Sequence, residues 1–440
     1  MPRFPGGLTK PEVSVPRISV AGIALALVLG LSAGPGLAQT RPTPPGPAAG
    51  VPGATLESVL SVARQLSPEL AARALDTEAA QARVMIAGSL PDPKMQVMSD
   101  DADRTSGPRL NRMTYSFEQD IPLWGKRGLR RDAAQAEVGQ MQALARGADV
   151  ELAERVKVAF VRYYAAYQAV HRTEDLHKAI HAVAEVARGR YAQGRGEQQD
   201  VFRAEMDTTR VATDIVRLDA DLKTAQGQLN ALLLRSASAP LAPPERLRPI
   251  PDLRNPDVAR LLDRAQQANP GLAADAAALS GAEANRKLAD KTWYPDITLG
   301  AGAIQRPGWG PPGYQAWVGI KVPLQWGLHE GEIRQAAAQA QAAEARLGVR
   351  EQQIRSDLVE AVAGFEGSRQ TADLIRRQLL PQAEALVRSG AASYAVDRTD
   401  LVSVLRNEHD LSDIRLQLLA AEFDSQRQLA AIERLIGGDL

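Results

Sequence analysis

Four short segments of the chain alternate apolar and polar residues with a period of two. They lie at about 93–101, 112–122, 296–305 and 314–324. Successive side chains of a β-strand point to opposite faces, so the alternation predicts four strands, each with one apolar and one polar face. The polar positions that we expect on one face of the second strand are Thr114, Ser116, Glu118 and Asp120.

Two long stretches carry apolar residues at helical spacing instead. Between about Lys126 and Tyr191 the chain has no proline, and apolar side chains recur three or four residues apart. At about 1.5 Å per residue, roughly 65 residues would span on the order of 100 Å, so such a helix needs packing partners along its whole length. A matching stretch begins near Glu332, where Pro381 predicts a kink or interruption near the far end.

The chain is a duplication with an offset near 200 residues. The stretch "SPELAARALD" from Ser67 is answered by "NPGLAADAAAL" from Asn269, and "YAQGRGEQQD" from Tyr191 by "YAVDRTDLVS" from Tyr394. We place the repeats at 55–235 and 258–436, joined by a proline-rich connector at 236–257 that cannot continue a helix. Each repeat holds a short helical lead-in, two strands and a long helical return. The predicted fold is therefore mainly α with a small β part.

Each repeat changes from strand to helix within a few residues, at "IPLWG" and at "VPLQWG". The proline ends the strand ladder, and the glycine permits a sharp turn. If the strands lie in a membrane, the tryptophan suits the interface between lipid and water; packing at a bend is the alternative interpretation. The junction residues are Pro122, Trp124 and Gly125 in the first repeat and Pro323, Trp326 and Gly327 in the second.

Charge and composition exclude several classes of function. The chain has 52 basic and 52 acidic residues, so no net field recruits nucleic acid. It has no cysteine, hence no disulfide, thiolate metal site or lipid-anchoring thiol. No glycine-rich phosphate loop, HExxH or nucleophile elbow occurs. We therefore predict neither an enzyme nor a catalytic, cofactor-binding or metal-binding residue.

Three histidines lie close together in the sequence, at positions 171, 177 and 181. On a helix His177 and His181 would share a face, as a pair of metal ligands would. No third ligand is apparent beside them, so the pattern favours a structural role for His171, His177 and His181 at the surface.

The N-terminus predicts export. Basic residues precede the apolar run "ISVAGIALALVLGLSAG", and Gly36 and Ala38 are small residues of the kind that a signal peptidase reads. We expect a signal peptide at 1–38 and a proline-rich linker at 39–54; an uncut anchor is the alternative. No later apolar run approaches the roughly 20 residues that a membrane helix needs, so any later crossing must use strands.

The duplicated "IPLWG" and "VPLQWG" junctions, the "LPDP" and "YPDI" strand starts and the turns at Tyr191 and Tyr394 resemble the TolC family of outer-membrane factors. The resemblance implies a homotrimer in the outer membrane whose protomers each give four strands to a 12-stranded transmembrane β-barrel, continued by a periplasmic α-helical barrel. It also implies an exit duct that works with a periplasmic adaptor (membrane fusion) protein and an inner-membrane pump, of RND type. "LPDP" followed by "IPLWGKRGLR" is similar to the heavy-metal efflux branch.

A secreted or envelope-anchored coiled-coil scaffold is the alternative function. The two alternating hairpins discriminate between the readings, because a scaffold does not need them. In the duct, the polar strand positions Thr114, Ser116, Glu118 and Asp120 would line the barrel lumen.

The resemblance places the turns after Tyr191 and Tyr394 at the periplasmic tip. Where the best-known members carry two aspartates in the second repeat, this chain has Ser403 and Arg406, so that acidic ring is not reproduced. For any one charged residue there, a solvated helix face is the alternative to a gate. The residues we expect at the tip and adaptor contact are Tyr191, Gly194, Arg195, Asp200, Arg203, Tyr394, Asp397, Arg398, Asp400, Ser403 and Arg406.

Overall fold

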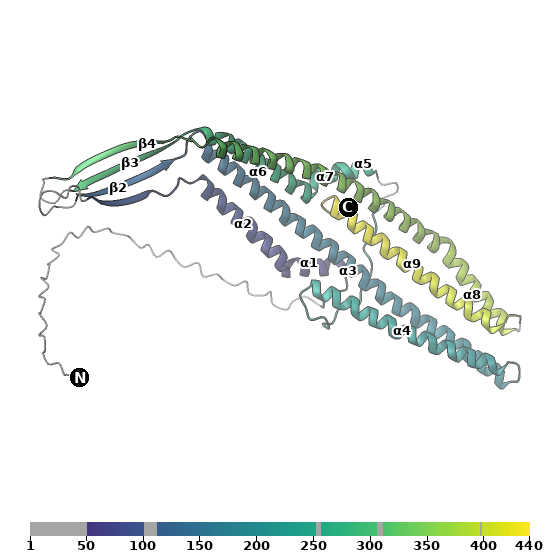
Figure 1. The fold of residues 1–440 in the computed structure, drawn as a ribbon. Helices are drawn as coiled ribbons and strands as arrows, with labels where there is room; N and C mark the ends of the chain where they lie inside the picture. Colours follow the sequence, from purple (N-terminus) through teal and green to yellow (C-terminus); the bar gives the residue numbers. More distant parts are fainter. Residues whose placement is uncertain (1–50, 101–111, 252–256, 306–310, 397) are drawn as a thin grey trace, which may run out of the picture. The chain divides into compact units, whose positions relative to one another are not determined.

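The computed structural model describes residues 51–100, 112–251, 257–305, 311–396 and 398–440. The predicted signal peptide, most of the predicted linker and Asp397 lie outside the described residues. The described part is mainly helical with one small sheet, as the repeat pattern predicts (Figure 1).

The sheet joins the two repeats. The first repeat supplies β1 (Lys94–Asp100) and β2 (Arg112–Ile121), and the second supplies β3 (Asp296–Gln305) and β4 (Gly313–Lys321). The strand order is β1-β2-β3-β4, and every neighbouring pair is antiparallel. In the described part of the chain, β1 and β4 therefore each have one edge without a strand partner. β4 ends before its predicted limit because Pro323 has no N–H with which to extend a ladder.

The long helices follow the sheet in each repeat. In the first repeat α3 runs unbroken through 67 residues, Lys126–Ala192, and α4 (Gln198–Leu232) returns beside it. In the second, α7 (Trp326–Leu374) is followed by a π-helical turn at Ile375–Leu379, by α8 (Leu380–Ala395) and by the returning α9 (Leu401–Leu435). The interruption expected from Pro381 is confirmed, and it takes the form of this π turn.

Shorter helices precede each hairpin. They are α1 (Leu56–Leu66) and α2 (Pro68–Gly88) in the first repeat, and α5 (Val258–Ala268) and α6 (Pro270–Asp290) in the second, the last followed by a 3₁₀ turn at Lys291–Trp293. The Ser67 hydroxyl and the Asn269 amide oxygen cap α2 and α6, and a proline stands at the first position of each. The duplicated "SP" and "NP" pairs are thus duplicated helix starts.

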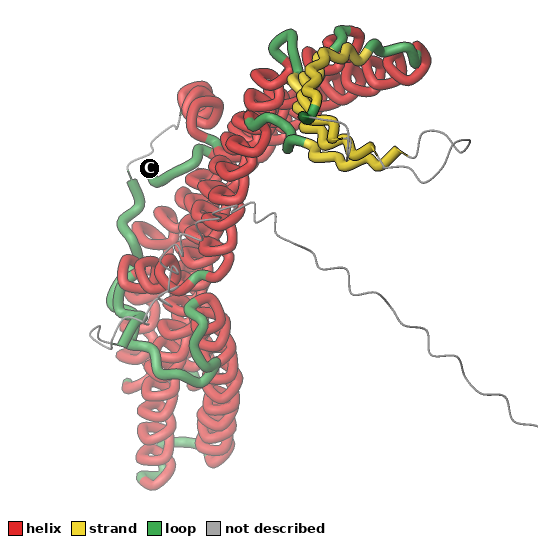
Figure 2. The backbone as a smooth tube through the Cα atoms, turned by 90° about the vertical axis from the view of Figure 1, so that its left-hand side faces the viewer, coloured by secondary structure: helices red, strands yellow, loops and turns green. Residues whose placement is uncertain are grey.

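The helices next to the sheet form a row. α3 packs against α2 on one side and α6 on the other, and α6 packs against α7. The row α2-α3-α6-α7 follows the strand order, so α2 stands at the β1 edge and α7 at the β4 edge. Figure 2 shows the strands at one end of these helices and the tight turns of the long helices at the other.

The apolar core is divided among separate clusters along the helices. One joins Leu152, Val156 and Phe160 of α3 to α1 and α4, and its counterpart joins Ile354, Leu358 and Phe365 of α7 to α5 and α9. A third, near the tips, includes Ile180 and Leu401. Each stretch of long helix thus has its own partners, as its length requires.

Among the described residues, no helix combines the length and apolar character that a membrane-spanning helix requires.

Candidate functional site

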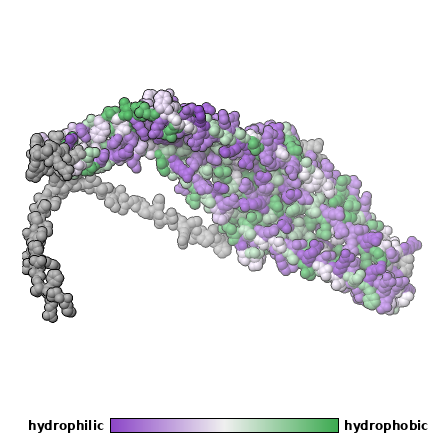
Figure 3. All heavy atoms as spheres, in the orientation of Figure 1, coloured by the Kyte–Doolittle hydropathy of each residue, from purple (hydrophilic) through white to green (hydrophobic). Residues whose placement is uncertain are grey.

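The two faces of the sheet differ in chemistry. One face carries Tyr115 and Phe117 of β2 and, in register with them across the sheet, apolar side chains of the other three strands. Many of these large side chains are exposed: Met95 is 81% exposed and Val318 67%. Figure 3 shows hydrophobic residues gathered at the surface over the strands. An apolar sheet face without a covering element is typical of a surface that meets lipid or another chain.

The opposite face is polar and internally ion-paired. Thr114, Ser116, Glu118 and Asp120 lie on it together, because they alternate with the apolar positions of β2. Lys94 Nζ donates to Asp120 at 3.0 Å, and the Thr298 hydroxyl donates to the same carboxylate at 2.6 Å. The Ser116 hydroxyl donates to the Gln96 carbonyl at 3.3 Å. The predicted lumen residues therefore share one face; that this face lines a lumen stays a prediction.

The first junction between strand and helix is tied to the start of β3. Trp124 adopts φ 60° and Gly125 φ 76°, so the chain turns through two left-handed residues before α3 begins at Lys126. The Leu123 N–H donates to Asp296 Oδ1 at 3.2 Å, and the Trp124 indole N–H donates to the Pro295 carbonyl at 2.8 Å.

A buried lysine completes this first-junction clamp, which we define as Leu123, Trp124, Lys126, Pro295 and Asp296. Lys126 Nζ, whose side chain is only 8% exposed, donates to Asp296 Oδ1 at 2.9 Å and to the Tyr294 carbonyl at 2.8 Å. Sequence reasoning missed Asp296 and Lys126 as site residues. The sequence feature that could have identified them is the Pro-Asp pair found at the start of the first hairpin and again at the start of the second. It indicates a contact with the junction only when β3 is known to lie beside β2.

The second junction is built differently. Helix α7 begins at Trp326 itself, so Gly327 lies inside its first turn and has no positive φ, and the prediction that this glycine permits the turn is wrong. The extra residue Gln325 supplies the linking geometry with φ −89° and ψ 79°. Trp326 is 73% exposed, and its ring lies near Trp293 with 5.7 Å between centroids. Pro323 follows the end of β4, as Pro122 follows β2.

The predicted tip residues lie at the turns between the long helices. Tyr191 lies in the last turn of α3, Gly194 (φ 71°) and Arg195 lie in the connecting turn, and Asp200 and Arg203 lie in the first turns of α4. Tyr394 stands near the end of α8, Arg398 follows in the turn, and Asp400 caps α9 by accepting from the Ser403 N–H at 3.2 Å. Arg406 lies further along α9.

Two contacts between the helix pairs at this end were not foreseen. Arg190 of α3 donates to the Tyr394 carbonyl at 2.6 Å and stands over the Tyr394 ring, with its guanidinium carbon 4.6 Å from the ring centroid. His409 Nε2 of α9 lies 2.9 Å from an Asp207 carboxylate oxygen of α4. Neither contact could be read from the sequence, because it joins residues about 200 positions apart on separate helices.

The carboxyls of this end differ in environment. The side-chain hydrogen bond from Ser403 lowers the pKa of Asp400, whereas burial raises the pKa of Glu408. Burial also raises the pKa of the Tyr394 phenol. Asp400 therefore keeps its charge to a lower pH than an ordinary aspartate, whereas Glu408 takes up a proton at a higher pH than an ordinary glutamate.

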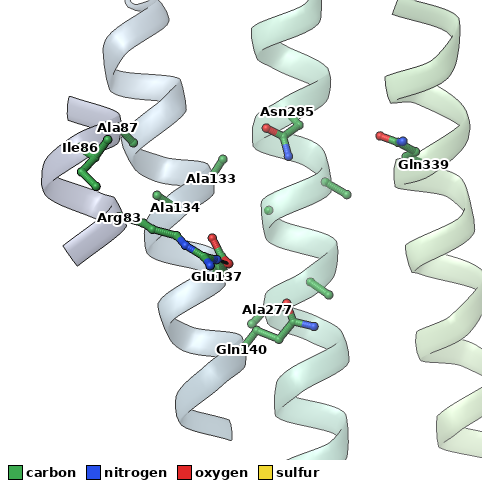
Figure 4. A pocket seen from close by; sticks show the side chains of 13 residues that line it. Arg83, Ile86, Ala87, Ala133, Ala134, Glu137, Gln140, Ala277, Asn285 and Gln339 are labelled. Atoms are coloured by element: carbon green, nitrogen blue, oxygen red, sulfur yellow. Dashed lines mark hydrogen bonds and ion pairs between the residues drawn. The ribbon is translucent and has the colours of Figure 1, made fainter. Parts of the chain in front are cut away.

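A hollow of about 620 Å³ lies along the row α2-α3-α6-α7. Figure 4 shows Arg83 of α2 directed toward Glu137 of α3, an ion pair, and Gln140, Asn285 and Gln339 beside the hollow. Most of its remaining lining is alanine, including Ala133, Ala134, Ala277, Ala278 and Ala282. A second cavity, of about 510 Å³, shares Asn285 and reaches Asp296 and Lys321, so a polar surface continues from the sheet onto the helices.

Nothing in the described residues gathers three or more His, Asp or Glu side chains in a metal-binding arrangement. His171 instead lies 3.0 Å from a Glu174 carboxylate oxygen one turn along α3, and its ring meets Tyr167 edge to face. The polar surface that continues from the sheet onto the helices carries paired charges and amides. Such groups suit transient contact with a solute better than tight binding of it.

Comparison with known proteins agrees with the fold. The family model described as outer membrane efflux protein matches residues 59–233 and 261–438, one segment for each repeat. The cobalt-zinc-cadmium resistance protein CzcC of Cupriavidus metallidurans is 23% identical over 384 residues, covering 87% of this chain and 90% of that protein. The nickel and cobalt resistance protein CnrC of the same organism is 26% identical over 306 residues, 66% of this chain and 69% of that protein.

Solved structures share the arrangement of elements at low sequence identity. The outer membrane protein VceC of Vibrio cholerae superposes with a TM-score of 0.74 at 19% identity, covering 87% of this chain and 96% of that chain. CusC superposes with a TM-score of 0.75 at 15% identity, covering 87% of this chain and 92% of that chain. Since the family model matches each of the two repeats, and the two matches together cover most of the chain, this chain belongs to the outer membrane efflux protein family.

Proposed function

We propose that the chain is the outer-membrane exit duct of a tripartite efflux system. In this proposal it conducts passively, receives its substrate from an inner-membrane pump and a periplasmic adaptor, and exports heavy-metal ions. Residues 1–38 would direct export and be removed, and the helices would stand in the periplasm.

The two-faced sheet with open edges is the observation that carries the proposal. Its exposed apolar face suits lipid, and its polar face suits water. Four strands cannot close on themselves into a barrel. The outer edges of β1 and β4 both present backbone N–H and C=O groups, so β4 of one copy can pair with β1 of another. Three copies joined head to tail would give a closed barrel of twelve strands. A coiled-coil scaffold has no need of such a sheet.

The helices support a duct that continues beyond the membrane. Side chains of four helices from α2 to α7 line one hollow, as a segment of a tube wall would. Alanines and amides along that surface offer a passage with few strong ligands. We assign the tips, with Arg195, Arg203, Arg398 and Arg406, to the adaptor end.

The cargo assignment rests on the relatives. CzcC and CnrC are named for resistance to cobalt, zinc, cadmium and nickel. Together with "LPDP" and "IPLWGKRGLR", these names support divalent heavy-metal ions as the cargo.

The first test is single-channel conductance of the mature protein in a planar bilayer, with the oligomeric mass determined on the same sample. A membrane-inserted trimer with discrete conductance steps is the expected result. A soluble, non-conducting coiled-coil oligomer would contradict the duct and favour the scaffold.

A second test addresses the cargo. A host deleted for its own metal-exporting outer-membrane channel should regain tolerance to cobalt, zinc or cadmium when this chain is expressed with a matching pump and adaptor. Tolerance to an organic drug without any metal tolerance would keep the duct and overturn the metal cargo.

A further inference from the structure

The first junction is clamped within the chain, whereas the second has the same donors without acceptors. At the first, the Leu123 N–H and the Trp124 indole N–H donate to Asp296 and to the Pro295 carbonyl. At the second, the equivalent donors are the Leu324 N–H and the Trp326 indole N–H. Within the described residues neither of them donates a hydrogen bond, and Leu324 and Trp326 are 72% and 73% exposed.

The matching acceptors stand at the opposite edge of the same chain. Asp92 and the Pro91 carbonyl stand just before β1, and in the other repeat Pro295 stands just before β3 and Asp296 begins it. The Pro91 carbonyl already accepts from Gln119 Nε2 at 2.7 Å, and its second lone pair can accept from another copy. Asp92 has no hydrogen bond or ion pair among the described residues, and every residue from 91 to 99 is exposed. Because β1 is at one end of the sheet and β4 at the other, Asp92 cannot be the neighbour of Leu324 in the order β1-β2-β3-β4 of one chain.

We propose that the second junction is completed by another copy of this chain, whose Asp92 and Pro91 carbonyl accept from Leu324 and Trp326. The proposal rests on the trimeric duct proposed above and deepens it, because it fixes the contact between copies. The β2–β3 contact inside the chain is the template for the contact between copies. In that contact β4 of one copy is equivalent to β2, and β1 of the next copy is equivalent to β3.

The template predicts the register between copies. Within the chain, Phe117 pairs with Ala301, Gln119 with Leu299 and Tyr115 with Ala303. Pro122 corresponds to Pro323, and Asp296 to Asp92, so each pair can be carried over residue by residue. The predicted pairs are Val318 with Val97 of the next copy, Ile320 with Met95, and Ala316 with Ser99.

This register keeps both faces of the sheet intact across the contact. Met95 and Val97 lie on the same face as Phe117 and Tyr115, and Val318 and Ile320 lie on that face too, opposite Leu299 and Ile297. A slip of one residue would turn the whole edge over and bring apolar residues to the polar face. Met95, Val97, Val318 and Ile320 are between 55% and 81% exposed in the single chain, and the contact covers their strand edges.

One difference from the template is expected. Lys126 has no counterpart at the second junction, where Leu328 follows Gly327. The contact between copies therefore lacks the buried ion pair with Asp296 and keeps only the two hydrogen bonds.

Paired cysteines test the register, since the natural chain has none. Directly opposed residues on antiparallel strands have Cβ atoms about 4.5–5.5 Å apart, and diagonal neighbours lie about 7–8 Å apart, whereas a disulfide needs about 3.5–4.5 Å. The double variant Val97→Cys/Val318→Cys should give covalent dimers and trimers on a non-reducing gel. The matched control Met95→Cys/Val318→Cys, which is shifted by two residues, should give at least tenfold less.

The outcomes separate the two proposals. A monomeric, non-conducting protein would contradict the duct itself. A conducting trimer in which the shifted pair cross-links better, or in which neither pair cross-links, would overturn the register while the duct stands.

The acceptor is tested by Asp92→Ala in the same preparation, because alanine offers no side-chain acceptor to the Leu324 N–H. We expect the trimer to dissociate at a temperature several degrees lower, with the helical content of the protomer unchanged. Glu78→Ala, at an exposed carboxylate of α2 with no partner among the described residues, is the matched control and should leave dissociation unaltered. Equal behaviour of the two variants would overturn the role of Asp92.

Discussion

The two repeats have the same order of elements but differ in the continuity of their long helix and in the contacts that hold strand to helix. In the first, α3 is continuous from Lys126 to Ala192, and its junction with β2 is clamped by Asp296. In the second, the equivalent helix is interrupted by the π turn at Ile375–Leu379, and among the residues that the structure describes its junction has no such clamp. The first repeat thus has one continuous long helix and the second has a long helix divided by a π turn. The two repeats keep the same fold, and the difference lies in a few residues.

The largest expected effect concerns a buried ionic cluster around Glu433 of the second repeat, whose equivalent position in the first repeat is uncharged. Glu433 of α9, 2% exposed, accepts from Lys157 Nζ at 2.7 Å and from Arg248 at 2.8 Å. The equivalent residue of α4 is the neutral Asn230, whose amide donates to Ala237 and Ala239 carbonyls. The cluster therefore joins α3, the connector and α9 at one point.

Glu433→Asn, which makes the second repeat resemble the first, should lower the free energy of unfolding by about 3–5 kcal/mol. Removing Glu433 leaves the partly buried Arg248 without its ion-pair partner and leaves the buried Lys157 with Asp439 as its remaining carboxylate. Thermal and denaturant unfolding in detergent would measure the loss, with the exposed, unpaired Glu351→Asn as the control. A loss below about 1 kcal/mol would mean that water or Asp439 takes over the role of Glu433.

The next prediction exchanges the interruption between the repeats. At Pro381 the chain is already adapted, because the Leu380 N–H donates to the Ile375 carbonyl five residues back. Counted back from Tyr394 and Tyr191, the aligned position in the unbroken α3 is Lys178, and Ala179 beside it offers a substitution site that makes no ion pair.

Ala179→Pro should cost about 3 kcal/mol or more, since proline removes a helical hydrogen bond and clashes with the preceding turn. Pro381→Ala should change stability by less than about 1 kcal/mol. Thermal unfolding of both variants would measure the contrast. Equal costs at the two sites would show that α3 is no stiffer than the α7–α8 segment.

The sequence predicted these elements from local signals. Alternation in "MTYSFEQDI" identified β2, the absence of proline after Lys126 identified α3, and Pro381 indicated the interruption. Such signals suffice because the periods of two and 3.6 residues are properties of single elements. The placement of Thr114, Ser116, Glu118 and Asp120 on one face followed from the same periodicity.

Contacts between elements could not be read in this way. The bond from Lys126 to Asp296 spans 170 positions, and that from Arg190 to Tyr394 spans 204. Gly327 failed as a turn residue because, with Gln325 inserted before it, α7 begins at Trp326, whereas α3 begins two residues further on, at Lys126, the counterpart of Leu328. The insertion of one residue is visible in the sequence. Its effect on the turn depends on the residue at which the helix begins, and the sequence pattern does not fix that residue.

A smaller effect is expected from the first-junction clamp itself. Asp296→Asn removes the charge opposite Lys126, whose side chain is 8% exposed, while leaving a hydrogen-bond acceptor for the Leu123 N–H. Hydrogen bonds to charged groups contribute about 1.5–3 kcal/mol, so we expect a loss of about 2 kcal/mol.

Unfolding monitored by tryptophan fluorescence would detect the change near Trp124. Asp132→Asn, an exposed carboxylate of α3 without a partner in the described residues, should have almost no effect. If both variants behaved alike, the clamp would contribute nothing beyond a surface charge, and the contrast between the two junctions would lose its energetic basis.

The smallest expected effect compares two equivalent glutamates near the tips. Glu205 of the first repeat accepts from Arg188 at 2.7 Å, whereas Glu408 of the second is half-buried, and burial raises its pKa above the ordinary 4.5. An acid whose pKa is higher in the folded than in the unfolded state binds more protons when folded. Its contribution to stability is therefore greatest at low pH and declines as the pH rises from about 4.5 through the raised value.

Glu408→Gln should remove this decline and leave the protein slightly more stable at pH 7, because the neutral amide carries no charge to bury. Glu205→Gln should do the opposite at pH 7, since it leaves Arg188 with one partner fewer. Melting temperatures measured from pH 4.5 to pH 7 for both variants would decide. A pH profile of Glu408→Gln that still falls as steeply as that of the natural chain would assign the decline to another carboxyl, and the two tips would then be electrostatically alike.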